Sequence, residues 1–494
     1  MNWSNSLLTL KHTQSNPDYR TPHYSHSYRH YLLLALLLVL VGCTCACGGS
    51  TGMANSLKPA ASSSPSPASS SQSPSSPAAP SSGGTSSPVA SPTSNVPAVN
   101  LLTFGSAGFG GDDTNLLQSA LNTTAANGQA LKIPAGTYNI NPISFPANSQ
   151  VLLDAGVTIQ ANAGYGPSDK MLTIKSQNVT ITGAGATAVI FKMRKSEYAA
   201  EHASDGSEYR HCLDLEGASN VTISGISCNQ SGGDGLYIGA GAQGQPSQNV
   251  TVTDCIFDQN FRQGWSLISG QHIFVYRSYF TNTSGTAPES GIDVEPNTPS
   301  NSVSDVHIED SFTTGNAGSG LSFAFWLMNG SSQNVDITVL RHHSTSNQLS
   351  GYDANNNDVT PNVQGKVLVQ DSFSDSNGSY GVLGHWYQAD GPTLVFQNLS
   401  ITNPHQNGPD PTYHDSAAVA CMRGGGGNAP IGNIQFSGVN IAVTNGKVDR
   451  YFNFADGSSK GVEKMVFAPG NLSGASQVPP NGLIQSAGFS TVNQ

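Results

Sequence analysis

A glycine that opens a strand of alternating side chains recurs along most of this chain. The clearest copy is Gly291-Ile292-Asp293-Val294-Glu295. Its two apolar residues point to one side of a strand and its two acidic residues to the other. The same frame recurs in the segments that begin at Gly235, Gly264, Gly320, Gly351 and Gly381. A pattern repeated this often predicts a repeat architecture.

The interval between strands supports one structural unit per repeat. Asn220 precedes Gly235, and Asn249 precedes Gly264, by the same 15 residues. A near-constant interval indicates one coil per repeat, with insertions confined to turns. Strands of successive coils then stack in parallel, about 4.8 Å apart. We therefore predict an all-β fold built as a parallel β-helix.

The front of the chain resembles an export signal. An apolar run follows Tyr31, and residues 40–43 read Leu-Val-Gly-Cys, which resembles a bacterial lipobox. We predict a signal peptide over residues 1–43 with lipidation at Cys43, and a protein that is exported and either lipid-anchored at the cell envelope or secreted. An ordinary signal peptide or an uncleaved anchor are the alternatives.

The remaining chain divides by composition. Residues 44–98 are rich in Ser, Pro and Ala, which predicts a disordered tether. We predict the β-helix domain over residues 99–450 and a C-terminal cap and tail over residues 451–494. The formal net charge is −11, so a nucleic-acid surface is not expected. We expect a monomer that contacts a membrane only through its lipid.

Motifs near the start of the domain resemble the pectate lyase superfamily. They are Phe104-Gly105, Gly110-Gly111-Asp112-Asp113-Thr114 and Ile133-Pro134-Ala135-Gly136-Thr137-Tyr138. The resemblance implies a right-handed parallel β-helix and a polysaccharide substrate. The catalytic signatures of polygalacturonases, classical pectate lyases and alginate epimerases are absent from the sequence, so no catalytic residue carries over.

A helix is expected to cover the open end of the solenoid. Asp113 can cap it, and apolar or small residues follow at helical spacing: Leu117, Ala120, Leu121 and Thr124. Terminal repeats need such a cover because interior repeats share their core with neighbours on both sides.

Four cysteines lie within the domain: Cys212, Cys228, Cys255 and Cys421. Disulfides are conceivable in an exported protein. However, Cys228 aligns with Phe257 in the repeat frame, which is a core position. We therefore favour buried free thiols.

Asp293 and Glu295 are the strongest candidates for catalysis, because they stand on one face of a strand roughly 6–7 Å apart at Cα. Paired carboxyl groups serve as acid and base, or acid and nucleophile, in glycoside hydrolysis. The neighbouring coils present the small residues Ser266, Ser322 and Ala324 at this position, which leaves room for a ligand.

Three further residues lie in the turns near this pair. Arg262 and Glu289 occupy the same frame position on adjacent coils. They could form a cross-coil ion pair, or Arg262 could orient substrate or bind a uronate carboxylate. Asp234 lies in a Gly-rich turn, where it either supports catalysis or caps the turn.

Aromatic and metal-binding candidates complete the set. Tyr237 and His385 fall at outward positions, and Trp386 is an adjacent ring that could stack on a sugar. An oxygen-rich run could bind Ca²⁺ or form an Asn-rich turn: Asp353, Asn355, Asn356, Asn357 and Asp358. No other cofactor is indicated. A later insertion holds His405, His414 and Asp415, either as a cleft wall or as a surface loop.

These observations favour an exported glycoside hydrolase. In it, Asp293 and Glu295 share the catalytic roles and Asp234 supports them. The residues expected to bind substrate are Arg262, Glu289, Tyr237, His385 and Trp386. One alternative is a uronate lyase or C5-epimerase, in which Arg262 or Ca²⁺ neutralises the uronate carboxylate and His385 or a tyrosine removes a proton. A non-catalytic carbohydrate-binding or cell-surface protein is the other alternative.

Overall fold

The structure, a computed structural model, describes residues 96–356, 361–423, 429–457 and 460–475. These belong to one compact unit that begins at Thr93. The predicted leader with Cys43, most of the tether and the predicted tail after residue 475 lie outside the described residues. None of the helices within the described ranges is long and apolar enough to cross a membrane.

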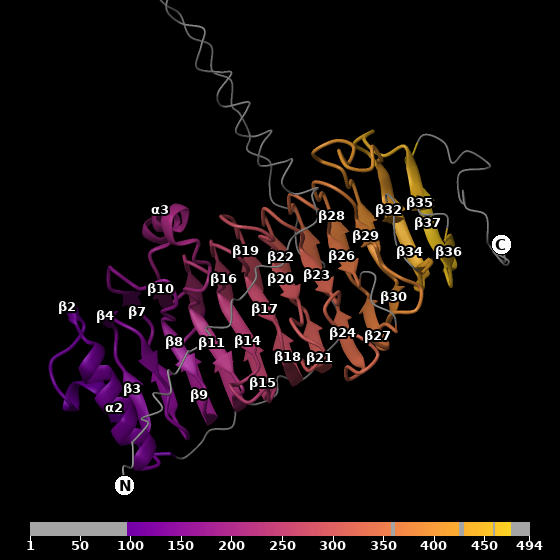
Figure 1. The fold of residues 1–494 in the computed structure, drawn as a ribbon. Coiled ribbons are helices and arrows are strands. Elements are labelled where there is room, and N and C mark those ends of the chain that lie inside the picture. The colour runs from indigo at the N-terminus through magenta and orange to yellow at the C-terminus, as the bar shows by residue number, and fades with distance from the viewer. Residues whose placement is uncertain (1–95, 357–360, 424–428, 458–459, 476–494) are drawn as a thin grey trace, which may run out of the picture. The chain divides into compact units, whose positions relative to one another are not determined.

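An 11-stranded parallel sheet carries the candidate residues. Its neighbouring strands belong to successive coils, from β5 to β35 (Figure 1). The strands are β5 (Ile143–Ser144), β8 (Leu172–Ile174), β11 (Leu213–Glu216), β14 (Leu236–Gly239), β17 (Trp265–Leu267), β20 (Ile292–Val294), β23 (Leu321–Ala324), β26 (Tyr352–Asn355), β29 (Val382–His385), β32 (Ala417–Arg423) and β35 (Arg450–Asp456).

The other faces of the coils form a 24-stranded parallel sheet. Its strands are β1 (Ala98–Asn100), β2 (Phe109–Asp112), β3 (Ala130–Ile133), β4 (Gly136–Ile140), β6 (Gln150–Leu153), β7 (Val157–Ala161), β9 (Gln177–Gly183), β10 (Val189–Lys192), β12 (Ser219–Ser224), β13 (Ser227–Asn229), β15 (Ser247–Thr253), β16 (Ile256–Asp258), β18 (Gly270–Tyr276), β19 (Tyr279–Thr281), β21 (Val303–Glu309), β22 (Phe312–Thr314), β24 (Val335–Leu340), β25 (His343–Thr345), β27 (Gly365–Gln370), β28 (Phe373–Asp375), β30 (Thr393–Gln397), β31 (Ser400–Thr402), β34 (Ile434–Ala442) and β37 (Val466–Ser473). The short strands β33 (Ile431–Gly432) and β36 (Val462–Glu463) pair separately.

The chain folds as a right-handed parallel β-helix, as predicted. A typical coil contains three strands, for example β14, β15 and β16, and each pairs in parallel with its counterpart in the next coil. The register also follows the sequence frame, since Leu236 pairs with Trp265 and Trp265 with Ile292. Parallel pairing continues beyond residue 450, through β35 and β37 to Ser473.

The predicted N-terminal helix is α2 (Thr114–Ala126), and its buried face includes Leu117, Ala120, Leu121 and Thr124. The capping differs from the prediction. Asp113 occupies the N-cap position but accepts a hydrogen bond from the Gly108 N–H, whereas Asp112 accepts one from the Thr114 N–H. A short 3₁₀ helix, η1 (Leu101–Thr103), precedes α2.

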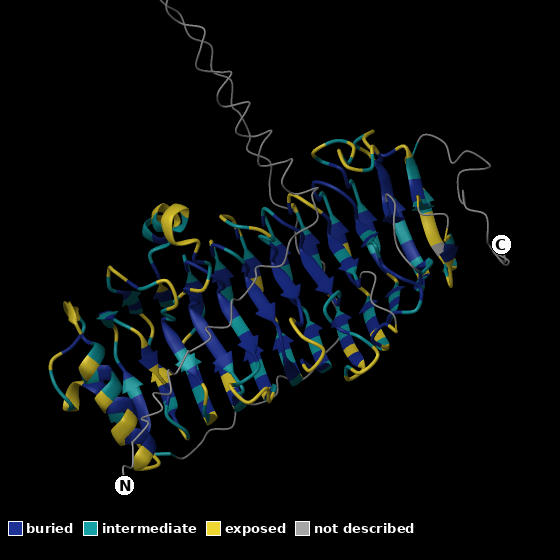
Figure 2. Cartoon of the chain, viewed as in Figure 1, coloured by how far each residue is buried: buried dark blue, intermediate teal, exposed yellow. Residues whose placement is uncertain are grey.

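A second helix, α3 (Lys195–Asp205), was not expected from the sequence. Tyr198 is its one buried side chain, and exposed residues gather on it in Figure 2. A helix with so little apolar surface gives no clear periodic signal. It forms an insertion between β10 and β11.

The inward positions of the strands form the continuous core, as predicted. Ile292 and Val294 are fully buried, and so are their counterparts on neighbouring strands. All four domain cysteines are buried free thiols, which confirms the preferred interpretation. Cys228 pairs in register with Phe257, the alignment from which the core position was inferred.

The outward positions differ from a simple surface. Ser266, Asp293 and Glu295 project away from the core yet are themselves buried. They are buried because turn residues pack over the outer face of the sheet. Arg262, for example, reaches both Ser266 and Glu295. The outer face of this sheet therefore holds polar side chains that are shielded from solvent.

Candidate functional site

Asp293 and Glu295 lie on one side of β20, as the alternation predicted. Asp293 is 2% exposed and Glu295 is 6% exposed. The residues in register with Asp293 on the neighbouring strands are Ser266 and Ser322. Two acidic groups buried between small side chains need specific partners, since burying a charge without one costs free energy.

Arg262 is the centre of the charge cluster. Its Nη2 lies 3.1 Å from Glu295 Oε2, its Nη1 lies 3.7 Å from Asp234 Oδ1, and its Nε lies 3.6 Å from Glu208 Oε2. Although burial lowers the pKa of Arg262, these carboxylates raise it above its ordinary value. One guanidinium group therefore forms ion-pair contacts with three acidic residues from three different segments.

Arg262 and Glu289 form no ion pair with each other, so the cross-coil pairing, one of the two alternatives, is not found. Glu289 turns back within its own loop, where its carboxylate accepts a hydrogen bond from the Gly285 N–H. Arg262 instead extends over the sheet, because Asp234 and Glu295 offer it partners in a more shielded position. Glu289 thus lies apart from the residues that Arg262 holds together.

Asp293 is held by a different partner. Gln263 donates a hydrogen bond from Nε2 to Asp293 Oδ2 at 2.8 Å, and its Oε1 accepts one from the Ser290 N–H. Asp293 Oδ1 is buried without a hydrogen-bond partner. Burial raises the pKa of Asp293 well above its ordinary value, and Glu295 adds to the rise while Arg262 opposes it. This environment favours a protonated carboxyl group.

Asp234 joins the cluster from its Gly-rich turn and is fully buried. Neither of its carboxyl oxygens has a hydrogen-bond partner. Burial raises the pKa of Asp234 to about 7, and Arg262 opposes the rise. The turn-capping alternative does not explain this side chain, because its oxygens bond to no backbone N–H among the described residues.

His211 was missed by the sequence analysis. Its Nδ1 accepts a hydrogen bond from the Asp234 N–H at 2.9 Å, so the ring proton lies on Nε2. Burial lowers the pKa of His211 well below its ordinary value, so the ring is neutral near neutral pH. It supports the turn that holds Asp234.

Tyr237 is half-buried and stacks on His211, with ring centroids 4.8 Å apart. Its ring lies over Gly239, where an added Cβ would come within 2.5 Å of Tyr237 Cε1. The small residue therefore lets the aromatic ring lie along the outer face. Tyr237 occupies the position predicted for a substrate-binding ring.

A second acidic pair on β11 was also missed. Asp214 pairs in register with Tyr237 and Glu216 with Gly239, so this pair occupies the frame positions of Asp293 and Glu295. Residues 213–216 show the same alternation, but Cys212 rather than Gly precedes them. Asp214 is 1% exposed, and burial raises its pKa to about 7.

We call Asp214, Glu216, Asp234, Asp293 and Glu295 the acidic face. Its two pairs lie three strands apart, or about 14 Å. Each pair follows from the same local alternation.

His385 and Trp386 lie elsewhere. β29, which carries His385, is three strands from β20, or about 14 Å. His385 contacts Trp386 and Tyr413 edge-on, and burial lowers its pKa to about 4. These rings form a separate aromatic group that does not touch the Arg262 cluster.

The described residues of the oxygen-rich run that begins at Asp353 are not arranged as a set of Ca²⁺ ligands. Asn356 is buried and accepts a hydrogen bond from the Gln388 N–H, while Asn357 and Asp358 lie outside the described residues. Within the described ranges, no three His, Cys, Asp or Glu side chains are grouped to hold a metal ion.

The late insertion has a structural anchor. The ring nitrogens of His405 lie 2.7 Å from the Ala417 carbonyl oxygen and 3.1 Å from that of Gly408. Asp415 accepts a hydrogen bond from the Ala417 N–H, and His414 is exposed. His405 and Asp415 therefore fix the insertion to its own coil.

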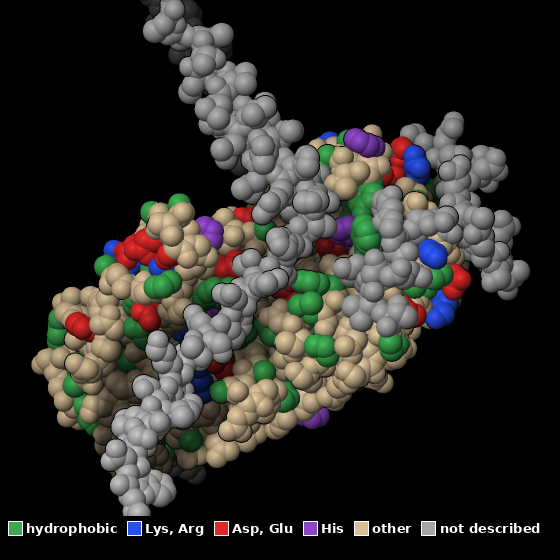
Figure 3. Space-filling view, in the orientation of Figure 1, with side chains coloured by type: hydrophobic (Ala, Val, Ile, Leu, Met, Phe, Trp, Pro, Cys, Tyr) green, Lys and Arg blue, Asp and Glu red, His purple; other side chains and the backbone are tan. Residues whose placement is uncertain are grey.

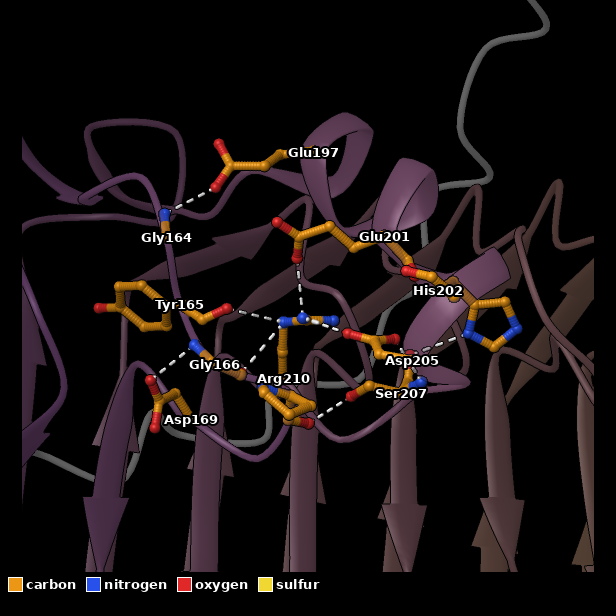
Figure 4. A network of polar contacts seen from close by, with 12 residues as sticks. Gly164, Tyr165, Gly166, Asp169, Glu197, Glu201, His202, Asp205, Ser207 and Arg210 are labelled. Carbon is orange, nitrogen blue, oxygen red and sulfur yellow. Dashed lines mark hydrogen bonds and ion pairs between the residues drawn. The ribbon is translucent and has the colours of Figure 1, made fainter.

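The α3 insertion supplies Glu208 to the cluster. Arg210 is buried below α3, where it donates hydrogen bonds to Glu201, Asp205 and two backbone carbonyl groups (Figure 4). Acidic side chains gather over α3 in Figure 3. The segment from α3 to Arg210 thus positions Glu208 beside Arg262.

Comparison with known proteins supports the fold. No protein-family model matches this chain. It is similar to the uncharacterized protein YclG of Bacillus subtilis (strain 168), at 23% identity over 209 residues. The match covers 37% of this chain and 35% of YclG, so the chain matches about a third of that relative's length.

Two solved structures share the architecture. The A-module of mannuronan C-5 epimerase AlgE4 from Azotobacter vinelandii is 16% identical with a TM-score of 0.50, covering 76% of this chain and 100% of that chain. A double mutant of the tailspike protein of E. coli bacteriophage HK620 is 16% identical with a TM-score of 0.56, covering 77% and 67% respectively. At these identities the likeness establishes the β-helix fold.

Proposed function

We propose that this protein acts on a polysaccharide outside the cell and hydrolyses its glycosidic bonds at Asp293 and Glu295. The observation that carries the proposal is the unlike environment of these two neighbouring carboxyl groups. Asp293 is buried with a raised pKa and a free Oδ1, whereas Glu295 is paired with Arg262. Pairs of acids whose environments differ in this way commonly divide the roles of acid and base.

The roles follow from those environments. Protonated Asp293 donates its proton to the glycosidic oxygen as the bond breaks. Glu295, paired with Arg262, either takes a proton from the attacking water or attacks the anomeric carbon itself. Asp234 supports the pair by sharing the charge of Arg262.

Two considerations support a polysaccharide substrate. The AlgE4 A-module, which shares this fold, is named for action on mannuronan, a polysaccharide. Tyr237 also offers a half-buried ring beside the acidic residues, which suits stacking against a sugar. Export and a lipid anchor at Cys43 remain part of the proposal and rest on the sequence of the leader.

The two alternative functions, a uronate lyase or epimerase and a non-catalytic binding protein, account for fewer of these contacts. A uronate lyase would use Arg262 or Ca²⁺ for the substrate carboxylate and His385 or a tyrosine as the base. Three protein carboxylates already surround Arg262, and His385 lies three strands from β20. In a non-catalytic binding protein, the acidic residues could all be paired with cations. Glu295 and Asp234 fit that description, since both contact Arg262, but Asp293 keeps a buried Oδ1 without a hydrogen-bond partner.

The proposal predicts that Asp293→Asn lowers the rate of release of reducing ends by at least about 100-fold, because general acid catalysis contributes that much or more. The purified protein is assayed on neutral and uronate polysaccharides. Asp336→Asn is the matched control, since Asp336 is exposed on β24. Equal rates for the two variants would refute the role of Asp293.

A further inference from the structure

Two cations near the acidic face already pair with carboxylates. Arg262 contacts Glu208, Asp234 and Glu295, and Lys175 lies 2.6 Å from Glu216. Lys170, from the segment before β8, donates a hydrogen bond to the Ser168 carbonyl oxygen. Among the described residues, Lys170 is therefore the one cation facing Asp214 that forms no ion pair with a carboxylate.

The acidic face, by contrast, has unused oxygen atoms. Asp214 Oδ1 and Asp293 Oδ1 are buried without hydrogen-bond partners, and both residues are at most 2% exposed. The two oxygens of Asp234 lie 3.7 Å from Arg262 Nη1 and 3.5 Å from His211 Nδ1. Asp214 and Asp293 occupy outward strand positions, so their carboxyl groups point away from the core. Buried polar atoms of this kind call for a partner that the chain itself does not supply.

The chemistry of that partner follows from the charges. A uronate carboxylate at this face would lose its hydration next to several acidic groups, and the nearby guanidinium is shared among three of them. Sugar hydroxyl groups have no such cost, since they can donate to one carboxyl oxygen and accept from a protonated one. Raised pKa values of Asp214 and Asp234, both about 7, keep such protonated groups available near neutral pH.

We propose that the acidic face binds a polysaccharide without carboxylate groups, with Asp214 forming a sugar-binding position about 14 Å from Asp293. The proposed ligand is an oligosaccharide that lies across β11, β14, β17 and β20, a span that includes both pairs. Tyr237 and neutral His211 lie between them as an aromatic stack. This inference rests on the proposed function and narrows its substrate class.

The test measures binding of the purified protein to an array of neutral oligosaccharides and of galacturonate and mannuronate oligosaccharides. We expect the bound glycans to carry no carboxylate. Asp214→Leu is expected to weaken binding about 10-fold, as expected for a lost hydrogen bond. Asp214→Asn, which resembles the protonated acid, is expected to keep binding within about threefold. The same melting temperature for both variants would show that both fold.

Several outcomes would overturn the inference. The first two are the absence of binding to any glycan on the array and preferential binding of uronate glycans. The third is an equal loss of glycan affinity in Asp214→Leu and Asp214→Asn. The fourth is binding of uronate glycans that Lys170→Met abolishes. Failure of the proposed hydrolysis is distinguishable from these. Neutral glycans that bind without release of reducing ends would contradict hydrolysis but support the proposed substrate class. Cleavage of uronate glycans would support hydrolysis but contradict the proposed substrate class.

Discussion

At the scale of single residues, Arg262 decides how the site is built. It links β20 to the turn that carries Asp234 and to Glu208 in the α3 insertion. A buried cation shared by several carboxylates is costly to remove, because it leaves charges buried without compensation.

Arg262→Met is therefore expected to lower the free energy of unfolding by about 3 kcal/mol at pH 7, as measured by urea denaturation. The loss should shrink at lower pH, where Asp234 binds a proton. Arg277→Met is the control, since Arg277 and Asp254 form an exposed pair worth less than about 1 kcal/mol. Similar losses for both variants would contradict the central role of Arg262.

Asp234 gives a pH dependence with a definite sign. Its pKa is about 7 in the folded protein and 3.8 ordinarily, so between about pH 4 and pH 7 the folded state holds a proton that the unfolded state releases. Stability from this group is therefore complete below about pH 4 and is lost as the pH rises through 7.

Asp234→Asn removes this contribution. The variant is expected to lose less stability than the wild-type protein between pH 4 and pH 7, by on the order of a few kcal/mol. Unfolding by urea at several pH values measures the difference, with Asp336→Asn as the exposed control. Parallel stability curves for Asp234→Asn and the wild-type protein would show that folding does not raise the pKa of Asp234.

At the scale of elements, α3 depends on one buried side chain. Arg210 binds Glu201 and Asp205 on the helix and the carbonyl groups of Tyr165 and Gly166 below it (Figure 4). With one buried apolar residue of its own, α3 has little hydrophobic packing to retain it.

Arg210→Met is expected to increase amide hydrogen exchange in residues 195–205 by at least about 10-fold, while β17 and β20 exchange as before. Arg194→Met is the control, because the Arg194–Glu197 pair is partly exposed and lies within one turn of the helix. If exchange in α3 stays at the wild-type rate in Arg210→Met, the helix is held by other contacts.

The elements also show what local sequence can predict. Alternation along a strand is a local signal, so the core residues and the positions of Asp293 and Glu295 could be predicted. The pair Asp214 and Glu216 shows the same alternation, but Cys212 rather than a glycine precedes it, so it falls outside the glycine-led pattern. The partners of Arg262 could not be predicted from this signal, because Glu208, Asp234 and Glu295 come from separate segments and meet only through their side-chain conformations.

At the scale of the whole molecule, stacking of coils turns local patterns into one continuous outer face. Each strand contributes one or two outward residues, and parallel register places those of successive coils about 4.8 Å apart. A surface assembled in this way suits an extended ligand that crosses several strands, which is why the account centres on a polysaccharide.

The most direct test follows reducing ends and the ultraviolet absorbance of unsaturated products in the same reaction. Hydrolysis predicts that reducing ends accumulate on a polysaccharide without any rise in absorbance. It also predicts that Asp293→Asn abolishes this release while Asp336→Asn preserves it. Absorbance that rises together with reducing ends would contradict hydrolysis and assign the site to a lyase.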